Sequence, residues 1–276
     1  MADNAQKRTY RTLPAWRKNA IAVHRLFLTD VFPDESSYGD SRWDSWEERI
    51  QQGHTKEEKL IERIYDRRKK RPNSNPSYDP DEWAGEDYMK TCRLTNAMYA
   101  ALVVSIWSEM EHFLKDVVLL CYQALEKRKK AIQTMQKFCE ATLAGTQTKA
   151  TLGSCIKALK EIDAGIPYAF DEIRKALEKE VGVEVDQCAE CITVNAVRIL
   201  NNSFKHVRGC YQPEDGKPHT RIDEALMKRW SIVNERSEID YSKLSVKELV
   251  IACNGFCADL LDRVETHLES KLGTAK

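Results

Sequence analysis

A long amphipathic pattern in the middle of the chain restricts the fold more than any other feature. Between about Asp87 and Lys130, apolar residues recur every three or four positions, which is the spacing of one face of an α-helix. The chain has only 11 glycines and 8 prolines in 276 residues, and no alternating strand pattern persists. We therefore predict an all-α fold, a helical bundle. The candidates for the core face of this long helix are Met98, Leu102, Met110, Phe113, Leu114, Val117, Cys121 and Leu125.

Shorter helical patterns occupy most of the remaining sequence. They predict helices at about 14–31, 41–71, 132–143, 151–163, 169–181, 185–208 and 246–272. Gly53 is a candidate interruption of the second, and Ser245 is the expected N-cap of the last. Residues 72–80, rich in proline, asparagine and serine, form the clearest loop. We predict a helical appendage and linker over residues 1–80 and a helical-bundle domain over residues 81–276.

Composition narrows the classes of partner. Lysine and arginine total 43 and so do aspartate and glutamate, so only a local site offers an electrostatic case for nucleic acid. The N-terminus lacks the apolar core of a signal peptide, and the most apolar run is too short to span a bilayer. The nine cysteines lack the spacing of a disulfide framework, which predicts free thiols in a reducing compartment. We expect a cytoplasmic protein without a membrane partner or a cofactor.

The segment before Gly209 concentrates polar chemistry beside an apolar stripe. At about 100° per residue, one stripe of this helix is expected to face the core: Val197, Leu200, Phe204 and Val207. The neighbouring flank carries amides, cations and a histidine: Asn195, Arg198, Asn202, Lys205 and His206. Arg198 and His206 lie about 12 Å apart at 1.5 Å of rise per residue. Asn201 is expected to point away from the flank, towards solvent. The pattern predicts a site on this helix.

Three features together resemble the HEPN superfamily of helical-bundle proteins. They are the helix containing residues 97–114, the helix ending in the run from Asn201 to His206 before a glycine, and the segment 238–245 that leads into an apolar C-terminal helix. The resemblance covers roughly residues 87–272. It implies a HEPN-like bundle, and many members of that family are metal-independent endoribonucleases. The family motif reads arginine, a polar residue and then histidine after four to six residues. His206 and Asn202 match it, whereas Asn201 occupies the arginine position.

The resemblance implies roles for the residues of the flank. His206 would take the proton from a ribose 2′-hydroxyl, Arg198 or Lys205 would hold the charge that develops on phosphorus, and Asn202 would orient the reacting groups. The family site is usually duplicated across a dimer, which implies a homodimer of the toxin or defence kind. Further RNA contacts are expected from Asn195, Asn201, Lys127, Arg128, Lys129 and Lys130. Because Asn201 occupies the position of the motif arginine, an alternative stays open. The chain would then be a catalytically silent helical module that binds or scaffolds a protein partner.

Glu111 is a further candidate for the site. It lies on the apolar stripe between Trp107 and Leu114, where a carboxylate is costly to bury unless it is paired. We expect Glu111 to be buried against Arg198 or Lys205, either as an acid that tunes the site or as a structural ion pair.

Two other patterns have competing interpretations. Cys188 and Cys191, with Cys253 and Cys257, have the spacing of zinc ligands, but both pairs fall within predicted helices, where core thiols are the commoner outcome. We therefore predict no metal. The basic run 67–71 suits either a phosphate backbone or the solvated end of a helix.

Overall fold

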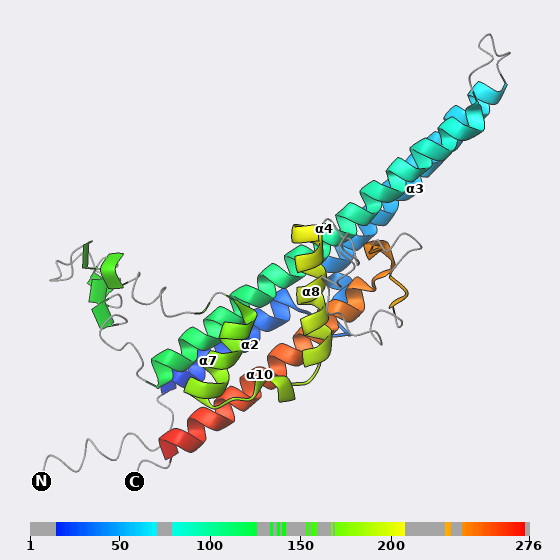
Figure 1. Ribbon diagram of the computed structural model, residues 1–276. Coiled ribbons are helices and arrows are strands. Elements are labelled where there is room, and N and C mark those ends of the chain that lie inside the picture. Colours follow the sequence, from blue (N-terminus) through cyan, green and yellow to red (C-terminus); the bar gives the residue numbers. More distant parts are fainter. Residues whose placement is uncertain are drawn as a thin grey trace, which may run out of the picture. The chain divides into compact units, whose positions relative to one another are not determined.

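The computed structural model shows an all-α protein (Figure 1). It describes residues 15–70, 79–125, 169–207 and 239–273, together with residues 133–134, 137–138, 140–141, 153–154, 156–158, 167 and 230–232. Every regular element among these residues is helical, as the sequence predicts. The predicted helices at 132–143 and 151–163, the basic residues Lys127–Lys130 and Gly209 lie mostly or wholly outside the described residues. In the described part of the chain, no helix is long and apolar enough to cross a membrane.

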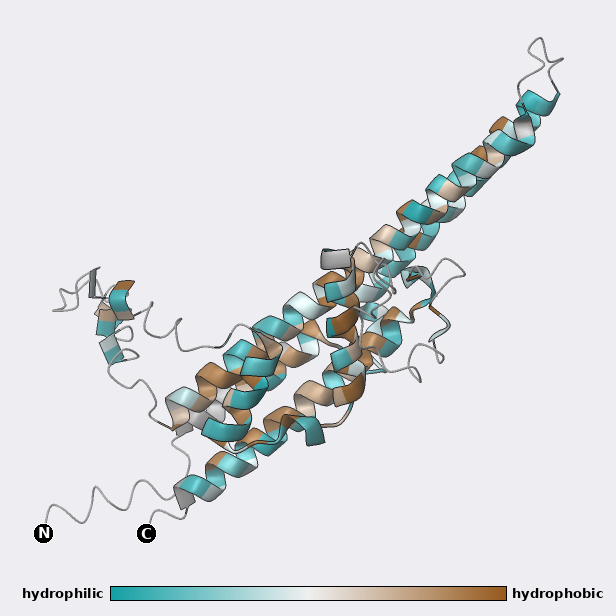
Figure 2. Cartoon of the chain, viewed as in Figure 1, coloured by the Kyte–Doolittle hydropathy of each residue, from teal (hydrophilic) through white to brown (hydrophobic). Residues whose placement is uncertain are grey.

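The N-terminal helices are α2 (Ala15–Val31) and α3 (Arg42–Lys69), separated by a short 3-10 turn, η1 (Tyr38–Asp40). The Ser41 hydroxyl caps α3 by accepting the backbone N–H of Asp44 at 3.2 Å. The prediction that Gly53 interrupts this helix is wrong, since α3 runs through it without a break. One glycine costs a helix only about 1 kcal/mol relative to alanine, and packing of the buried Trp43 and Ile50 outweighs it. Figure 2 shows hydrophilic residues along most of α3.

Helix α4 (Pro80–Ala124) is the long helix that the sequence predicts, and it begins seven residues earlier than expected. Proline is favourable in a first helical turn, and the carboxylate of Asp79 accepts the N–H of Asp81 at 2.8 Å. Met98 is exposed instead of buried, and Phe113 and Leu125 are half-buried. The other predicted core residues are buried: Leu102, Met110, Leu114, Val117 and Cys121.

In the described part of the C-terminal half lie the helices α7 (Phe170–Ala176), α8 (Cys191–Val207) and α10 (Val246–Gly273). Helix α7 continues into a π-helical turn, η2 (Leu177–Val181), and ends at Gly182. Helix α8 begins six residues later than predicted, because a 3-10 turn, η3 (Val185–Gln187), and Glu190 at a φ of 57° precede it. The N-cap prediction for α10 is confirmed, since the Ser245 hydroxyl accepts the N–H of Glu248 at 3.2 Å. Another 3-10 turn, η4 (Tyr241–Lys243), lies just before α10.

Contacts group the chain into two compact units. Unit 1 contains residues 1–31, 109–191 and 254–276, and unit 2 contains residues 32–108 and 192–253. In unit 1 the Arg25 guanidinium on α2 pairs with Glu265 and Asp262 on α10 at 2.7 and 2.6 Å. The predicted domain boundary near residue 80 falls between α3 and α4, and both helices contribute to unit 2. The division into a 1–80 appendage and an 81–276 domain stays a prediction.

Candidate functional site

Helix α8 turns one polar flank outwards and buries nearly everything else. Asn195 and Arg198 are half-buried, and Asn202 and Lys205 are exposed. Apart from the first turn and the half-buried Phe204, the other described side chains of α8 are buried: Thr193, Val194, Ala196, Val197, Ile199, Leu200, Asn201 and Ser203. The predicted flank is therefore the solvent-facing side of the helix. It carries two cations and two amides without an acid, which suits an anionic ligand.

Hydrogen bonds orient the amides of this flank. The Arg198 Nε donates to the Asn195 Oδ1 at 3.0 Å, which holds the guanidinium one turn from the amide. The Asn202 Oδ1 accepts the Asn201 Nδ2 at 3.1 Å, so the amide nitrogen of Asn202 is directed away from that bond. Lys205 continues the flank one turn later. The side chain of His206 lies outside the described residues, although its backbone belongs to α8.

The expected orientation of Asn201 is wrong. Its side chain is 2% exposed rather than solvated, and its Oδ1 is buried without a hydrogen-bond partner among the described residues. A helix that packed on one side only would have left this position open. Because most of the circumference of α8 is buried, the position at which the HEPN motif has arginine faces the interior. In this structure Asn201 does not present its amide to an RNA phosphate.

A buried tyrosine fixes α8 in place within unit 2. The Tyr241 hydroxyl donates to the Leu200 carbonyl at 2.9 Å, and its ring meets Phe204 edge to face at 5.9 Å. Burial raises the pKa of this hydroxyl above its ordinary value, which keeps the donor protonated. Asn96 on α4 holds the same segment from the other side, since it accepts the N–H of Tyr241 at 2.5 Å and donates to the carbonyl of Ile239 at 3.1 Å. The site helix therefore rests on a rigid support.

Glu111 does not reach the burial expected of it. Trp107 and Leu114 are buried as predicted, but the Glu111 side chain between them is only half-buried. The intervening position lies at the edge of the apolar stripe, where a long carboxylate side chain reaches water. Glu111 belongs to unit 1, whereas Arg198 and Lys205 belong to unit 2. Its pairing with either cation stays a prediction.

The cysteines resemble core thiols more than metal ligands. Cys188, Cys253 and Cys257 are buried and Cys191 is half-buried, all as free thiols. Burial raises the pKa of Cys188 to about 12, which disfavours the thiolate that binds zinc. Among the described residues, no three side chains of histidine, cysteine, aspartate or glutamate gather as a metal site requires.

The basic run at the end of α3 is solvated in its described part. Arg67, Arg68 and Lys69 are exposed in the last turn, and Arg71 lies outside the described residues. The Arg68 guanidinium lies over the ring of Trp83, 4.1 Å from its centre. This stacking turns Arg68 towards α4.

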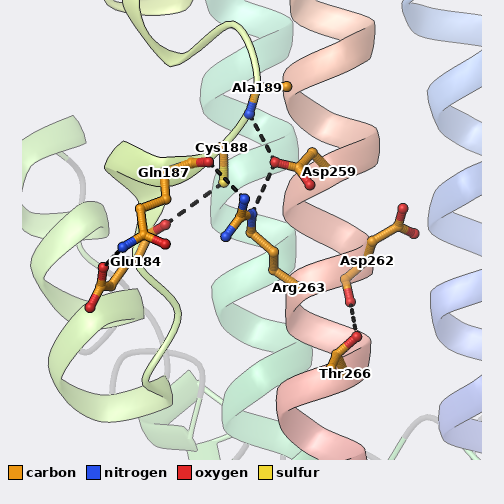
Figure 3. Close-up of polar contacts among 8 residues, drawn as sticks. All are labelled: Glu184, Gln187, Cys188, Ala189, Asp259, Asp262, Arg263 and Thr266. Carbon is orange, nitrogen blue, oxygen red and sulfur yellow. Dashed lines mark hydrogen bonds and ion pairs between the residues drawn. The ribbon is translucent and has the colours of Figure 1, made fainter.

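A cleft in unit 1 was not predicted from the sequence. It has a volume of about 580 Å³ and lies between the segment 182–187 and α10. Figure 3 shows Asp259 and Arg263 between the two elements. The Asp259 carboxylate accepts the N–H of Ala189 at 2.8 Å and the Nε of Arg263 at 2.9 Å, while Arg263 also donates to the Gln187 carbonyl at 2.7 Å. Both charges are therefore used to hold the segment against α10.

The ionisable groups of this cleft respond differently to their surroundings. Partial burial raises the pKa of Asp259, but the bonds from Ala189 and Arg263 outweigh it and lower the pKa below its ordinary value. Burial and the charge of Lys271 lower the pKa of His267. The His267 Nε2 is buried and has no hydrogen-bond partner among the described residues. In the sequence, this arrangement is indicated only by Asp259 and Arg263, which lie four residues apart on a predicted helix and can therefore pair.

No family model matches the chain, and no curated protein or solved structure matches it either. The resemblance to the HEPN superfamily stays a prediction from the residues named above.

Proposed function

We propose that the chain binds RNA at the α8 flank and cleaves it without a metal, as a HEPN-like endoribonuclease of the toxin or defence kind. The observation that carries the proposal is the outward side of α8. On a helix that is otherwise buried, this side offers Asn195, Arg198, Asn202 and Lys205 and no acid. Phosphate is the ligand that such a set of donors and cations favours.

The chemistry requires three roles. His206 takes the proton from a ribose 2′-hydroxyl, and the 2′-oxygen then attacks phosphorus. Lys205 or Arg198 stabilises the negative charge that accumulates on the phosphoryl oxygens. The 5′-oxygen leaves and takes a proton from water, which gives a cyclic phosphate and a 5′-hydroxyl. Asn202 binds a phosphoryl oxygen through its amide nitrogen.

The proposal includes a homodimer. Arg198 lies about 12 Å from His206 along the same helix, and its Nε is bonded to Asn195, one turn further from His206. A second copy that packs α8 against α8 would bring a cation to each histidine. Light scattering at micromolar concentrations tests this step. A mass near 31.8 kDa at every concentration would refute the composite site.

One observation favours a second candidate function. The position that carries arginine in the HEPN motif holds Asn201, a neutral and buried amide, and therefore supplies no cation. The alternative is therefore a catalytically silent helical module whose α8 flank binds a protein partner. In that case the α8 flank would neither cleave nor bind RNA.

The decisive experiment measures RNA cleavage and binding in EDTA. We expect the wild type to cut a single-stranded RNA and His206→Ala to lose cleavage while it retains binding. The matched control is His112→Ala, because His112 is exposed on α4 and lies outside the site. Lys205→Ala is expected to weaken binding and to reduce its salt dependence.

The outcomes separate the two candidates. Equal cleavage by the wild type and His206→Ala would refute the catalytic role of His206. A wild type that binds no RNA would refute the RNA function and favour the silent module. A toxin role predicts in addition that expression of the wild type arrests growth and that expression of His206→Ala does not.

A further inference from the structure

One face of α3 carries a continuous row of cations. At about 100° per residue, six of them fall within an arc of about 80°: Arg42, Arg49, Lys56, Arg63, Arg67 and Lys70. Five of these repeat every seven residues, which is about 10.5 Å of rise, and the row extends over about 42 Å. All six side chains are exposed. We call this set the α3 basic face.

The α3 basic face lies opposite the side that packs on α4. The contacts between the two helices include Gln51 with Tyr99, the ring of His54 with the Thr95 hydroxyl at 2.9 Å, and Arg68 over Trp83. These α3 residues fall about 120° to 220° from the centre of the basic face around the helix axis. Most of the cations therefore point to the solvent side of the α3–α4 pair, whereas Arg49 also borders a groove that residues of α4 line.

Around Arg49 and Lys56 the placement of charges on α3 does not serve helix stability, whereas Asp66 lies three residues from Arg63 and the cations of the last turn suit the helix dipole. An exposed helix usually sets acids three or four residues from its cations. The residues at those distances from Arg49 are Ser45, Trp46, Gln52 and Gly53, none of them acidic. Arg63 and Arg67 are four residues apart, which is mutually repulsive. In the described part of the chain, Arg49, Lys56, Arg63 and Arg67 form no ion pair.

A polyanion complements this face, and its composition indicates which kind. A helix that inserts into a membrane has an apolar centre with cations at its borders, and a helix that docks in a coiled coil has an apolar seam. Here the cations form the centre. In the described part of the chain, the large exposed apolar side chains nearby include Trp46 and Leu60 on α3 and Met98 on α4, at 41%, 49% and 43% exposure. A row of cations without acids or an apolar seam is suited to phosphates.

The straightness of the row favours a single strand over a duplex. Along about 42 Å a duplex strand winds through more than one full turn of about 34 Å, so it would leave the row. An extended single strand can follow the row throughout. Beside Arg49, a groove of about 280 Å³ is lined by Trp46, Met98 and Ala101, and its walls are largely apolar. Such a surface accepts an unstacked base.

We infer that the α3 basic face binds the phosphate backbone of a single-stranded nucleic acid, with Trp46 stacking on a base. This site lies on a different helix from the α8 flank and needs no 2′-hydroxyl, so it does not depend on the proposed cleavage. Single-stranded DNA is the appropriate probe, because the 2′-hydroxyl chemistry cannot act on it.

The test is the anisotropy of a labelled oligothymidylate titrated with the full chain at several salt concentrations. The variant Arg49→Gln/Lys56→Gln removes two phosphate contacts. For single strands, each phosphate contact contributes about 0.7 to the slope of log Kd against log salt concentration, so two lost contacts reduce this slope by about 1.4. The ratio of the variant's Kd to the wild-type Kd is therefore expected to be about 25 times larger at 0.1 M salt than at 1 M. The control is Lys175→Gln/Lys179→Gln, which removes two exposed cations of unit 1 and leaves binding unchanged.

Trp46→Ala provides a second, uncharged test. Loss of the stacking surface is expected to weaken binding at least fivefold without a change in salt slope, whereas Leu60→Ala has no effect. Far-ultraviolet circular dichroism checks that each variant is folded. An unchanged dissociation constant for Arg49→Gln/Lys56→Gln, or an equal loss in the unit 1 control, would overturn the inference. So would binding to phosphatidylserine vesicles or to polyglutamate that is as tight as binding to DNA.

Discussion

Gly182 leaves less room for an added methyl group than Gly39, Gly53, Gly85 or Gly255 does. It ends the π-helical turn after α7 with a φ of 91°, and its N–H donates to the Leu177 carbonyl at 2.7 Å. A Cβ placed on Gly182 would lie 2.6 Å from the His267 Cε1 and 2.9 Å from its Nε2. Gly182→Ala therefore meets both an unfavourable backbone conformation and a ring.

The magnitude follows from these two costs. A left-handed conformation costs a residue with a Cβ about 1–2 kcal/mol, and overpacking a close contact costs about 1–3 kcal/mol. Alanine gives the unfolded chain less conformational entropy than glycine does, which stabilises the folded state by about 0.4–1 kcal/mol. We expect Gly182→Ala to lower the free energy of unfolding by about 1–4.5 kcal/mol.

Urea unfolding followed by circular dichroism measures this loss. The double variant Gly182→Ala/His267→Ala tests its cause, because removal of the ring should cancel the steric part and leave the backbone part. Gly53→Ala is the matched control. Gly53 is exposed within α3 and has nothing within 4 Å of its added Cβ, so alanine there should stabilise by about 1 kcal/mol. The reasoning fails if Gly182→Ala is as stable as the wild type, or loses as much in the His267→Ala background.

Other predictions concern the support of α8, the half-buried carboxylate and the response to pH. Asn96→Ala strands two backbone groups of the segment before α10 and should cost about 2–4 kcal/mol in urea unfolding, whereas Asn96→Asp keeps the acceptor and costs less. Tyr241→Phe loses one hydrogen bond to α8 and should cost about 1 kcal/mol by the same assay, without a change in the circular dichroism spectrum. Glu111→Gln should change the free energy of unfolding by less than about 1 kcal/mol, measured from the shift in melting temperature. A larger loss would show that Glu111 forms a buried ion pair. Burial and the charge of Lys271 lower the pKa of His267 in the folded chain, so the unfolded chain is the first to bind a proton as the pH falls. Stability should therefore decrease as the pH drops below about 6.5, the ordinary pKa of histidine, and it should decrease less steeply in His267→Asn when the two melting curves are compared.

The periodic pattern alone was enough to predict most of the helices and one side of the candidate site. The core residues Leu102 to Cys121 on α4 and the cap at Ser245 follow from local rules, because helix geometry and capping depend on residues a few positions apart. The polar flank of α8 was predictable for the same reason. The seven-residue repeat of cations on α3 is also visible in the sequence, but its exposure depends on where α4 packs.

Tertiary structure decided which polar groups are accessible. Asn201 is buried because packing covers α8 on nearly every side except the flank. The helical pattern of a sequence does not show how many sides of a helix its neighbours cover. The cleft of unit 1 required the segment 182–190 to meet α10, about 70 residues later in the chain. The glycine at 182 becomes essential only because His267 stands against it. The sequence by itself therefore determined the helices and their polar faces, while long-range packing determined which of those faces water and ligands reach.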